Sequence, residues 1–129
     1  MITEMQKKEL IKKAIDVRKN AYSPYSNYKV GAALLSKSGK IYTGANYENA
    51  SFGAGVCAER IALGNALSNG ERDFLAICIC GNDANITPCG ICRQSLSEFS
   101  DIEVICCNKD GDTRSNKLSN LLPNAFSFG

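Results

Sequence analysis

A continuous apolar segment, Phe74 to Cys80, constrains the fold of this 129-residue chain more than any other feature. It is too short to cross a bilayer, since a spanning helix needs about 20 apolar residues, and it is typical of a fully buried strand. A second apolar strand is predicted at Glu103 to Cys107, and a helix from Cys89 to Phe99 separates the two. A crossover helix lets two neighbouring strands run parallel. The segment order therefore predicts an α/β fold.

The remaining elements follow from hydrophobic periodicity and from turn residues. Thr3 and Gln6 form a capping box that opens a helix, and Pro24 is expected to end it. We expect helices over 4–22, 57–68 and 89–99 and a short one ending at 122, and strands over 29–35, 40–44, 74–80, 103–107 and 113–117. The first two strands should pair as a hairpin through Ser38-Gly39. Residues 1–129 are predicted to form one domain, an α/β sandwich around a mixed sheet.

The counts of cysteine and histidine limit the chemistry. The chain has 7 cysteines and no histidine. An odd number of cysteines without a signal peptide argues against a disulfide framework, so we expect a cytoplasmic protein with no membrane partner. The lack of histidine excludes Ser-His-Asp and Cys-His pairs, so proton transfer must use another side chain or bound water. A net charge of +2 without a basic stripe gives little support for a nucleic-acid partner.

Three cysteines lie where two predicted helices begin. Cys89 and Cys92 form a C-x-x-C pair, and Cys57 begins the helix over 57–68. Helix starts offer unpaired N–H groups and a positive dipole end, and both favour thiolate. Three thiolates could bind Zn²⁺ and leave one tetrahedral position open. Two alternative interpretations are a redox-active C-x-x-C pair and a structural zinc site with a fourth cysteine ligand. The other cysteines, which we expect mainly in the core, are Cys78, Cys80, Cys106 and Cys107.

Glu59 distinguishes among these interpretations. It lies two residues after Cys57, in the first turn of the same predicted helix. Residues at this spacing do not share a side of a regular helix, but they can converge on a metal that lies beyond the helix end. Glu59 could then face the open position and move a proton from activated water to a substrate. The alternative is a carboxylate that only stabilises the helix dipole.

The segments Cys57-Ala58-Glu59-Arg60 and Pro88-Cys89-Gly90-Ile91-Cys92-Arg93-Gln94 resemble the small homotetrameric zinc-dependent cytidine deaminases in their three-cysteine form. Matches at 21–26, 30–35, 44–50 and 121–126 extend the resemblance over nearly the whole chain. Zinc deaminases hold their metal with His or Cys plus two Cys and use a Glu that is not a ligand. The resemblance implies a three-layer α-β-α sandwich with a five-stranded mixed sheet and one Zn²⁺ per subunit. It also implies hydrolytic deamination of cytidine and deoxycytidine to uridine and deoxyuridine plus ammonia, a reaction of pyrimidine salvage.

The same resemblance implies roles for particular residues. Cys57, Cys89 and Cys92 would bind zinc, and Glu59 would be the proton shuttle. Arg60 matches an arginine that hydrogen-bonds the ligand thiolates and offsets their charge. Asn46 and Glu48 match residues that bind the ribose, and Ala58 is a further implied substrate-binding residue. Tyr28 lies where a phenylalanine usually packs on the base, and Phe52 lies where a tyrosine is usual. Phe126 matches a residue that reaches the substrate pocket of a neighbouring subunit. A homotetramer with shared active sites is implied as well.

Three other functions are alternatives to this one. A blasticidin S-type nucleoside antibiotic deaminase has the same zinc chemistry, but Arg60 and the pair Asn46 and Glu48 favour cytidine. A nucleic-acid-editing deaminase usually has His as its first ligand and needs a basic surface. A zinc-stabilised binding module without activity would have a closed four-cysteine site.

Overall fold

The computed structural model describes residues 2–129 and has its elements in the predicted order. The helices are α1 (Glu4–Arg18), α2 (Ala58–Ser68), α3 (Gly90–Ser97) and α4 (Leu118–Leu121), with a 3-10 turn at Phe52–Ala54. The strands are β1 (Gly31–Ser36), β2 (Ile41–Ala45), β3 (Phe74–Cys80), β4 (Glu103–Cys107) and β5 (Thr113–Lys117).

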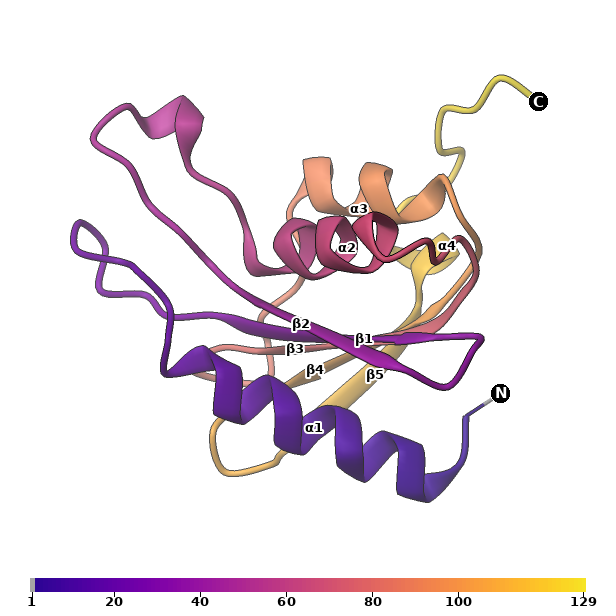
Figure 1. Ribbon diagram of the computed structural model, residues 1–129, viewed down its shortest axis with the longest axis horizontal. Coiled ribbons are helices and arrows are strands. Elements are labelled where there is room, and N and C mark those ends of the chain that lie inside the picture. The colour runs from indigo at the N-terminus through magenta and orange to yellow at the C-terminus, as the bar shows by residue number, and fades with distance from the viewer. Residues whose placement is uncertain (1) are drawn as a thin grey trace.

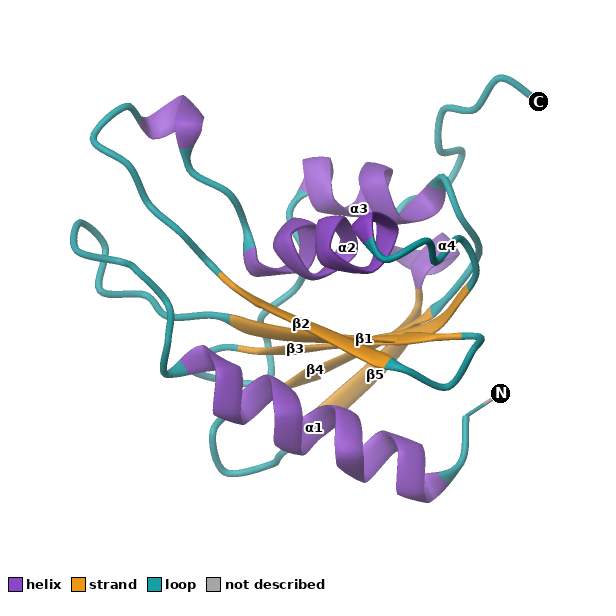
Figure 2. Cartoon of the chain, viewed as in Figure 1, coloured by secondary structure: helices purple, strands orange, loops and turns teal. Residues whose placement is uncertain are grey.

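One mixed sheet of five strands, in the order β2-β1-β3-β4-β5, forms the centre of the molecule (Figure 2). β1 is antiparallel to both β2 and β3, and β4 is antiparallel to β5. β3 and β4 are parallel, as expected for strands joined through α3. The β1–β2 hairpin turns at Gly39, whose φ of 94° a side chain would disfavour. The predicted hairpin and the predicted parallel pair are therefore both confirmed.

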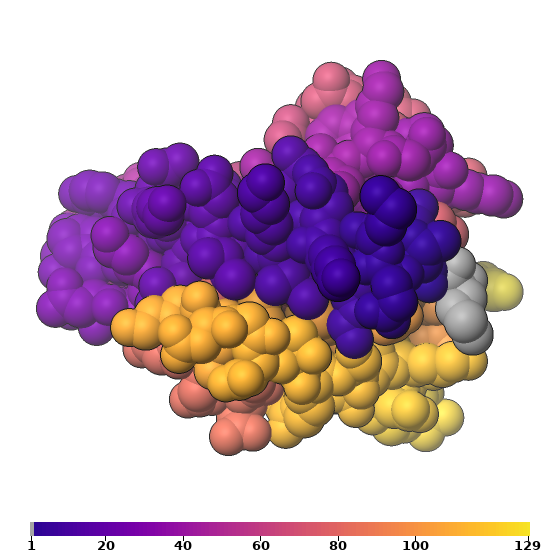
Figure 3. All heavy atoms as spheres, turned by 90° about the horizontal axis from the view of Figure 1, so that it is seen from below, coloured from indigo at the N-terminus to yellow at the C-terminus, as the bar shows by residue number. Residues whose placement is uncertain are grey.

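Helices cover both faces of the sheet. α1 lies on one face, and α2, α3 and α4 lie on the other (Figure 1). Seen from below, the indigo helix α1 lies across its face beside the orange and yellow part of the chain (Figure 3). Two clusters of buried side chains fill the spaces between the layers. The predicted three-layer α-β-α sandwich is confirmed. Within residues 2–129, no helix combines the length and apolar character needed to cross a membrane.

Gly44 in β2 fixes how closely α2 approaches the sheet. A Cβ at this position would lie 2.5 Å from the backbone nitrogen of Ala62 and 2.7 Å from the carbonyl oxygen of Ala58. Both atoms belong to the backbone and cannot rotate away. The absence of a side chain at Gly44 therefore lets the first turns of α2 pack directly on β2.

The prediction that the first helix extends to residue 22 is wrong. α1 ends at Arg18, and Tyr22 instead forms a parallel bridge with Tyr47. The backbone N–H of Tyr22 donates to the carbonyl of Asn46 at 2.9 Å. The bridge holds the backbone at Tyr22 in a non-helical conformation, so the helix ends before the position at which Pro24 was expected to end it. The other boundaries coincide with the predicted ones or differ from them by at most two residues.

Candidate metal centre

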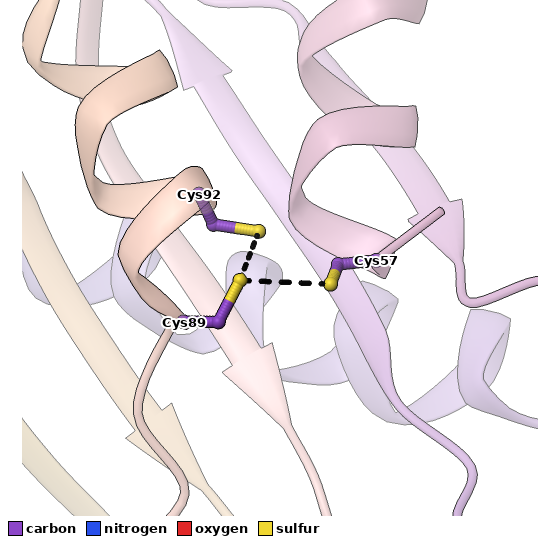
Figure 4. A group of neighbouring side chains, drawn as sticks. All are labelled: Cys57, Cys89 and Cys92. Atoms are coloured by element: carbon purple, nitrogen blue, oxygen red, sulfur yellow. Dashed lines mark hydrogen bonds between the residues drawn. The ribbon is translucent and has the colours of Figure 1, made fainter. Parts of the chain in front are cut away.

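Three sulfur atoms come together at the adjacent starts of α2 and α3 (Figure 4). Cys57 is the N-cap residue of α2, Cys89 is the N-cap residue of α3, and Cys92 lies in the first turn of α3. The Sγ atoms are 3.8 Å apart for Cys57 and Cys89 and 3.5 Å apart for Cys89 and Cys92. All three sulfur atoms lie within 4.8 Å of one another.

The sulfur spacing fits a zinc ion. A tetrahedral site with Zn–S bonds of about 2.3 Å has sulfur atoms about 3.8 Å apart. The cluster contains three sulfurs, and the predicted core cysteines do not join it. Cys78, Cys80, Cys106 and Cys107 are each 0% exposed within strands β3 and β4. The described residues therefore form a three-sulfur group compatible with one zinc ion and an open fourth position, and not a closed four-cysteine site.

The electrostatics of the cluster favour a thiolate at Cys57. Hydrogen bonds from Cys92 above all, and from Arg60 and Cys89, lower the pKa of Cys57 to about 5 against the effect of burial. The Nη2 atom of Arg60 donates to the Cys57 sulfur at 3.9 Å. The same pairing with Cys57, together with burial, raises the pKa of Cys92. A bound cation would remove this competition for protons, because zinc binds thiolates.

Glu59 is buried beside the sulfur cluster, with 5% of its surface exposed. Burial raises the pKa of Glu59 to about 7. The negative charge of Cys57 also raises it, whereas hydrogen bonding with Cys92 and the positive charge of Arg60 act in the opposite direction. A carboxyl group in this setting can hold or release a proton near neutral pH.

A hydrogen-bonded network joins the residues predicted to hold the ribose. Asn46 accepts from the backbone N–H of Val30 and donates to the carbonyl of Tyr28, both at 2.9 Å. Glu48 accepts from the backbone N–H groups of Tyr25 and Ser26 and from the Ser26 hydroxyl. These bonds, chiefly the one from the Ser26 hydroxyl, lower the pKa of Glu48.

The ribose-binding candidates lie next to the segment that enters the metal centre. Tyr47, between Asn46 and Glu48, pairs antiparallel with Val56, and Val56 directly precedes Cys57. Ala58 follows Cys57 and is fully buried.

Phe52 and Phe126 lie at the surface, with 82% and 67% of their area exposed. Phe52 contacts Tyr25 edge-on with ring centroids 6.3 Å apart. The carbonyl of Phe126 accepts a hydrogen bond from the Gln94 side chain at 3.0 Å. Phe126 also packs edge-on against Phe128, with ring centroids 5.2 Å apart. Among the described residues, these interactions place neither ring against the sulfur cluster.

Two residues in these networks were not predicted. Ser26 bonds to Glu48, and Arg93 bonds to backbone carbonyls beside the C-x-x-C pair. Both belong to segments on which the family resemblance rests, and that membership was the only signal for them. Their partners lie far away in the sequence or are backbone atoms, which side-chain patterns do not reveal.

Comparison with known proteins identifies the family. Residues 4–108 match the family model described as the cytidine and deoxycytidylate deaminase zinc-binding region. The chain belongs to this family.

Individual relatives are similar over almost their whole length. The cytidine deaminase of Halalkalibacterium halodurans is 47% identical over 126 residues, which cover 95% of this chain and 96% of that protein. The probable cytidine deaminase of Dictyostelium discoideum is 45% identical, over 92% of this chain and 85% of that protein. The crystal structure of cytidine deaminase from Burkholderia pseudomallei superposes with a TM-score of 0.87 at 45% identity, covering 97% of this chain and all of that one. The structure of the Mycobacterium tuberculosis enzyme gives a TM-score of 0.82 at 32% identity, covering 98% of this chain and all of the other.

Proposed function

We propose that the protein is a zinc-dependent cytidine deaminase that hydrolyses cytidine and deoxycytidine to uridine and deoxyuridine plus ammonia. The observation that carries the proposal is the group of three sulfur atoms with the buried carboxyl of Glu59 beside it. Family membership and the names of the relatives support cytidine as the substrate over a nucleoside antibiotic. The small net charge of +2 supports a free nucleoside over a nucleic acid.

The proposed roles follow from this arrangement. Zinc, held by Cys57, Cys89 and Cys92, would act as a Lewis acid and lower the pKa of a water molecule. Glu59 would accept a proton from that water as the water oxygen forms its bond to C4, and would deliver this proton to N3 of the base. Glu59 would then transfer the remaining hydroxyl proton to the amino group, so that the C4–N bond breaks, ammonia leaves and C4 becomes a carbonyl. Burial supports this role, because a desolvated carboxylate is a stronger base than an exposed one.

Arg60 would offset the charge of the ligands. Three thiolates outweigh the charge of Zn²⁺ by one, which makes a bound water less acidic. The guanidinium donates to the Cys57 sulfur at 3.9 Å, and the starts of α2 and α3 add their positive dipole ends. These groups would restore part of the acidity that catalysis requires.

The remaining site residues would bind the nucleoside. Asn46 and Glu48 would hold the ribose hydroxyls, and Tyr28 would pack on the base beside Ala58. The carbonyl of Tyr28 accepts a hydrogen bond from the Asn46 side chain, which links the proposed base-packing residue to the proposed ribose ligand. Phe52 would stand where relatives have a tyrosine.

Oligomerisation would complete the site. We propose a homotetramer in which Phe126 reaches the pocket of a neighbouring subunit. The exposed rings of Phe52 and Phe126 and the exposed sulfur-bearing residue Cys89 support this assembly, since each would gain cover from another copy. Light scattering should give the mass of four chains.

We also propose that residues 1–129 act as a single domain in the cytoplasm. The sharing of one sheet by β1 through β5 supports one domain. The seven unpaired cysteines support a reducing compartment.

The test is an ultraviolet assay of cytidine loss. Glu59→Gln should keep zinc but lose turnover by about 10²- to 10⁴-fold, because the amide cannot carry the proton. Glu98→Gln removes an exposed carboxyl at the other end of α3 and should keep full activity. Full activity in Glu59→Gln would remove Glu59 from the mechanism, and a zinc-loaded wild type without turnover would overturn the function itself.

A further inference from the structure

Arg93 makes a set of hydrogen bonds around Cys89 that the proposed mechanism does not use. Its Nε donates to the carbonyl of Pro88 at 2.7 Å, and its Nη1 donates to the carbonyl of Leu121 at 2.6 Å. Its backbone N–H donates to the carbonyl of Cys89 at 2.9 Å. The Arg93 side chain therefore binds the carbonyl that precedes Cys89 and the carbonyl of Leu121. The backbone bond to Cys89 is the ordinary first bond of the helix, which any residue at position 93 would make.

These bonds restrain the least buried of the three sulfur-bearing residues. Cys92 is buried and Cys57 is partly buried, but Cys89 is exposed and receives little support from packing. The Pro88 carbonyl shares a planar peptide unit with the Cys89 nitrogen, so fixing its oxygen also fixes the backbone that carries the sulfur. Pro88 is fully buried, which leaves that carbonyl few other partners.

The outer end of the guanidinium is attached to a fixed part of the fold. Leu121 is the last residue of α4, which lies beside α3 (Figure 1). α4 is held by Leu118, which is 2% exposed and whose N–H donates to the carbonyl of Ile102 at 2.9 Å. Arg93 thus connects the start of α3 to the core through α4.

We propose that Arg93 is a positioning residue that holds Cys89 in place for the metal and so slows the loss of zinc. The proposal rests on the proposed function for the identity of the metal. A metal leaves only after its ligands detach one by one, and a loosened Cys89 would detach first. Changes to groups that orient metal ligands cost about 10- to 100-fold in metal affinity.

The test measures zinc release from the zinc-loaded full chain into an excess of a chromogenic chelator. Arg93→Met should release zinc about 10- to 100-fold faster than wild type. Arg93→Lys keeps the charge but lacks the rigid fork that binds two carbonyls at once, so it should also release zinc faster. Unchanged release from Arg93→Met would overturn the proposal. So would wild-type release from Arg93→Lys beside fast release from Arg93→Met, because charge alone would then explain the effect.

Arg72 provides a matched control. Its Nη1 also donates to two backbone carbonyls, those of Leu67 at 3.1 Å and Glu71 at 2.7 Å, at the far end of α2 from Cys57. Arg72→Met should lower the melting temperature of the metal-free protein but leave zinc release unchanged. Equally fast release from Arg72→Met would indicate general loosening and overturn the role of Arg93. If Arg93→Met does not fold, Arg93→Lys carries the test.

Cytidine turnover by the loaded wild type separates this proposal from the function on which it rests. A wild type that holds zinc but leaves cytidine unchanged overturns the proposed function, while the comparison of release rates still stands. Equal release from wild type and both Arg93 variants overturns the positioning role and leaves the function intact. A wild type that takes up no added zinc overturns both.

Discussion

Ser26 connects two residues of the proposed nucleoside site through one hydroxyl group. The hydroxyl donates to Glu48 and accepts from the backbone N–H of Tyr28 at 3.0 Å. The Ser26 backbone N–H donates to the same carboxylate at 3.1 Å. One small side chain therefore orients both a proposed ribose ligand and the backbone of a proposed base-packing residue.

Ser26→Ala should raise KM for cytidine about tenfold with a smaller change in kcat, because hydrogen bonds to charged groups contribute about 1.5–3 kcal/mol. Steady-state kinetics at several cytidine concentrations checks this. Thr3→Ala removes a comparable hydroxyl from the capping box of α1 and should leave KM unchanged while costing about 1 kcal/mol of stability. A drop in kcat alone for Ser26→Ala would contradict the role in binding.

At the residue scale, the sequence reveals side chains whose partners are specified by local spacing. The three cysteines could be predicted because each lies at a helix start, where the reason for a thiolate is local. Ser26 and Arg93 could not, because their partners lie 22 residues away at Glu48 and 28 residues away at Leu121. Such bonds depend on which segments the fold brings together.

Helix α2 is the element on which the metal centre depends most. It carries Cys57 at its N-cap and Glu59 in its first turn, and its distance from the sheet is set at Gly44. Gly64 lies on the exposed side of the same helix, and a Cβ added there would have no neighbouring atom within 4 Å outside the helix's own backbone. The two glycines therefore allow the packing and the intrinsic stability of α2 to be changed separately.

Gly44→Ala should cost about 1–3 kcal/mol, the usual range for overpacking, and should also reduce cytidine turnover because α2 must shift. Gly64→Ala should instead stabilise the protein by about 0.5–1 kcal/mol, since alanine favours a helix interior over glycine, and should keep full activity. Urea unfolding and the cytidine assay measure both. Equal effects of the two substitutions would contradict the packing described for Gly44.

At the element scale, the sequence patterns predicted every α-helix and strand but not the 3-10 turn at Phe52–Ala54, and they extended the first helix too far. The strands at 74–80 and 103–107 match the structure because both are mainly apolar and buried. The strand at 113–117 is polar and exposed, and its signal is the turn at 110–112 that precedes it. α1 was predicted too long because the rule for Pro24 is local. The bridge between Tyr22 and Tyr47 is a long-range pairing that ends the helix earlier.

At the scale of the whole molecule, Glu71 connects the β1–β2 hairpin to the loop that follows α2. Its carboxylate follows α2 and accepts from the hydroxyls of Ser36 at 2.6 Å, Ser38 at 2.7 Å and Tyr42 at 2.9 Å. These hydrogen bonds, that from Ser36 most of all, lower the pKa of Glu71. The β1–β2 hairpin is thus held to the loop after α2 by an ionised group.

Stability should therefore fall in acid in a way that depends on Glu71. A carboxyl whose pKa is lower in the folded state stabilises the fold above its unfolded pKa, and this contribution is lost as pH falls through the folded pKa. Glu71→Gln should be less stable than wild type at pH 7, and the difference should shrink as pH falls below about 4.3. Urea unfolding over this range measures it. A difference that stays constant with pH would contradict the role of the ionised carboxylate.

The proposed activity depends on how the whole molecule coordinates the metal. X-ray absorption at the zinc edge of the purified protein measures it directly. We predict three sulfur ligands at about 2.3 Å and one lighter oxygen or nitrogen ligand. Four sulfur ligands, or a folded and active protein without zinc, would contradict the claim that Cys57, Cys89 and Cys92 hold a catalytic metal with one open position.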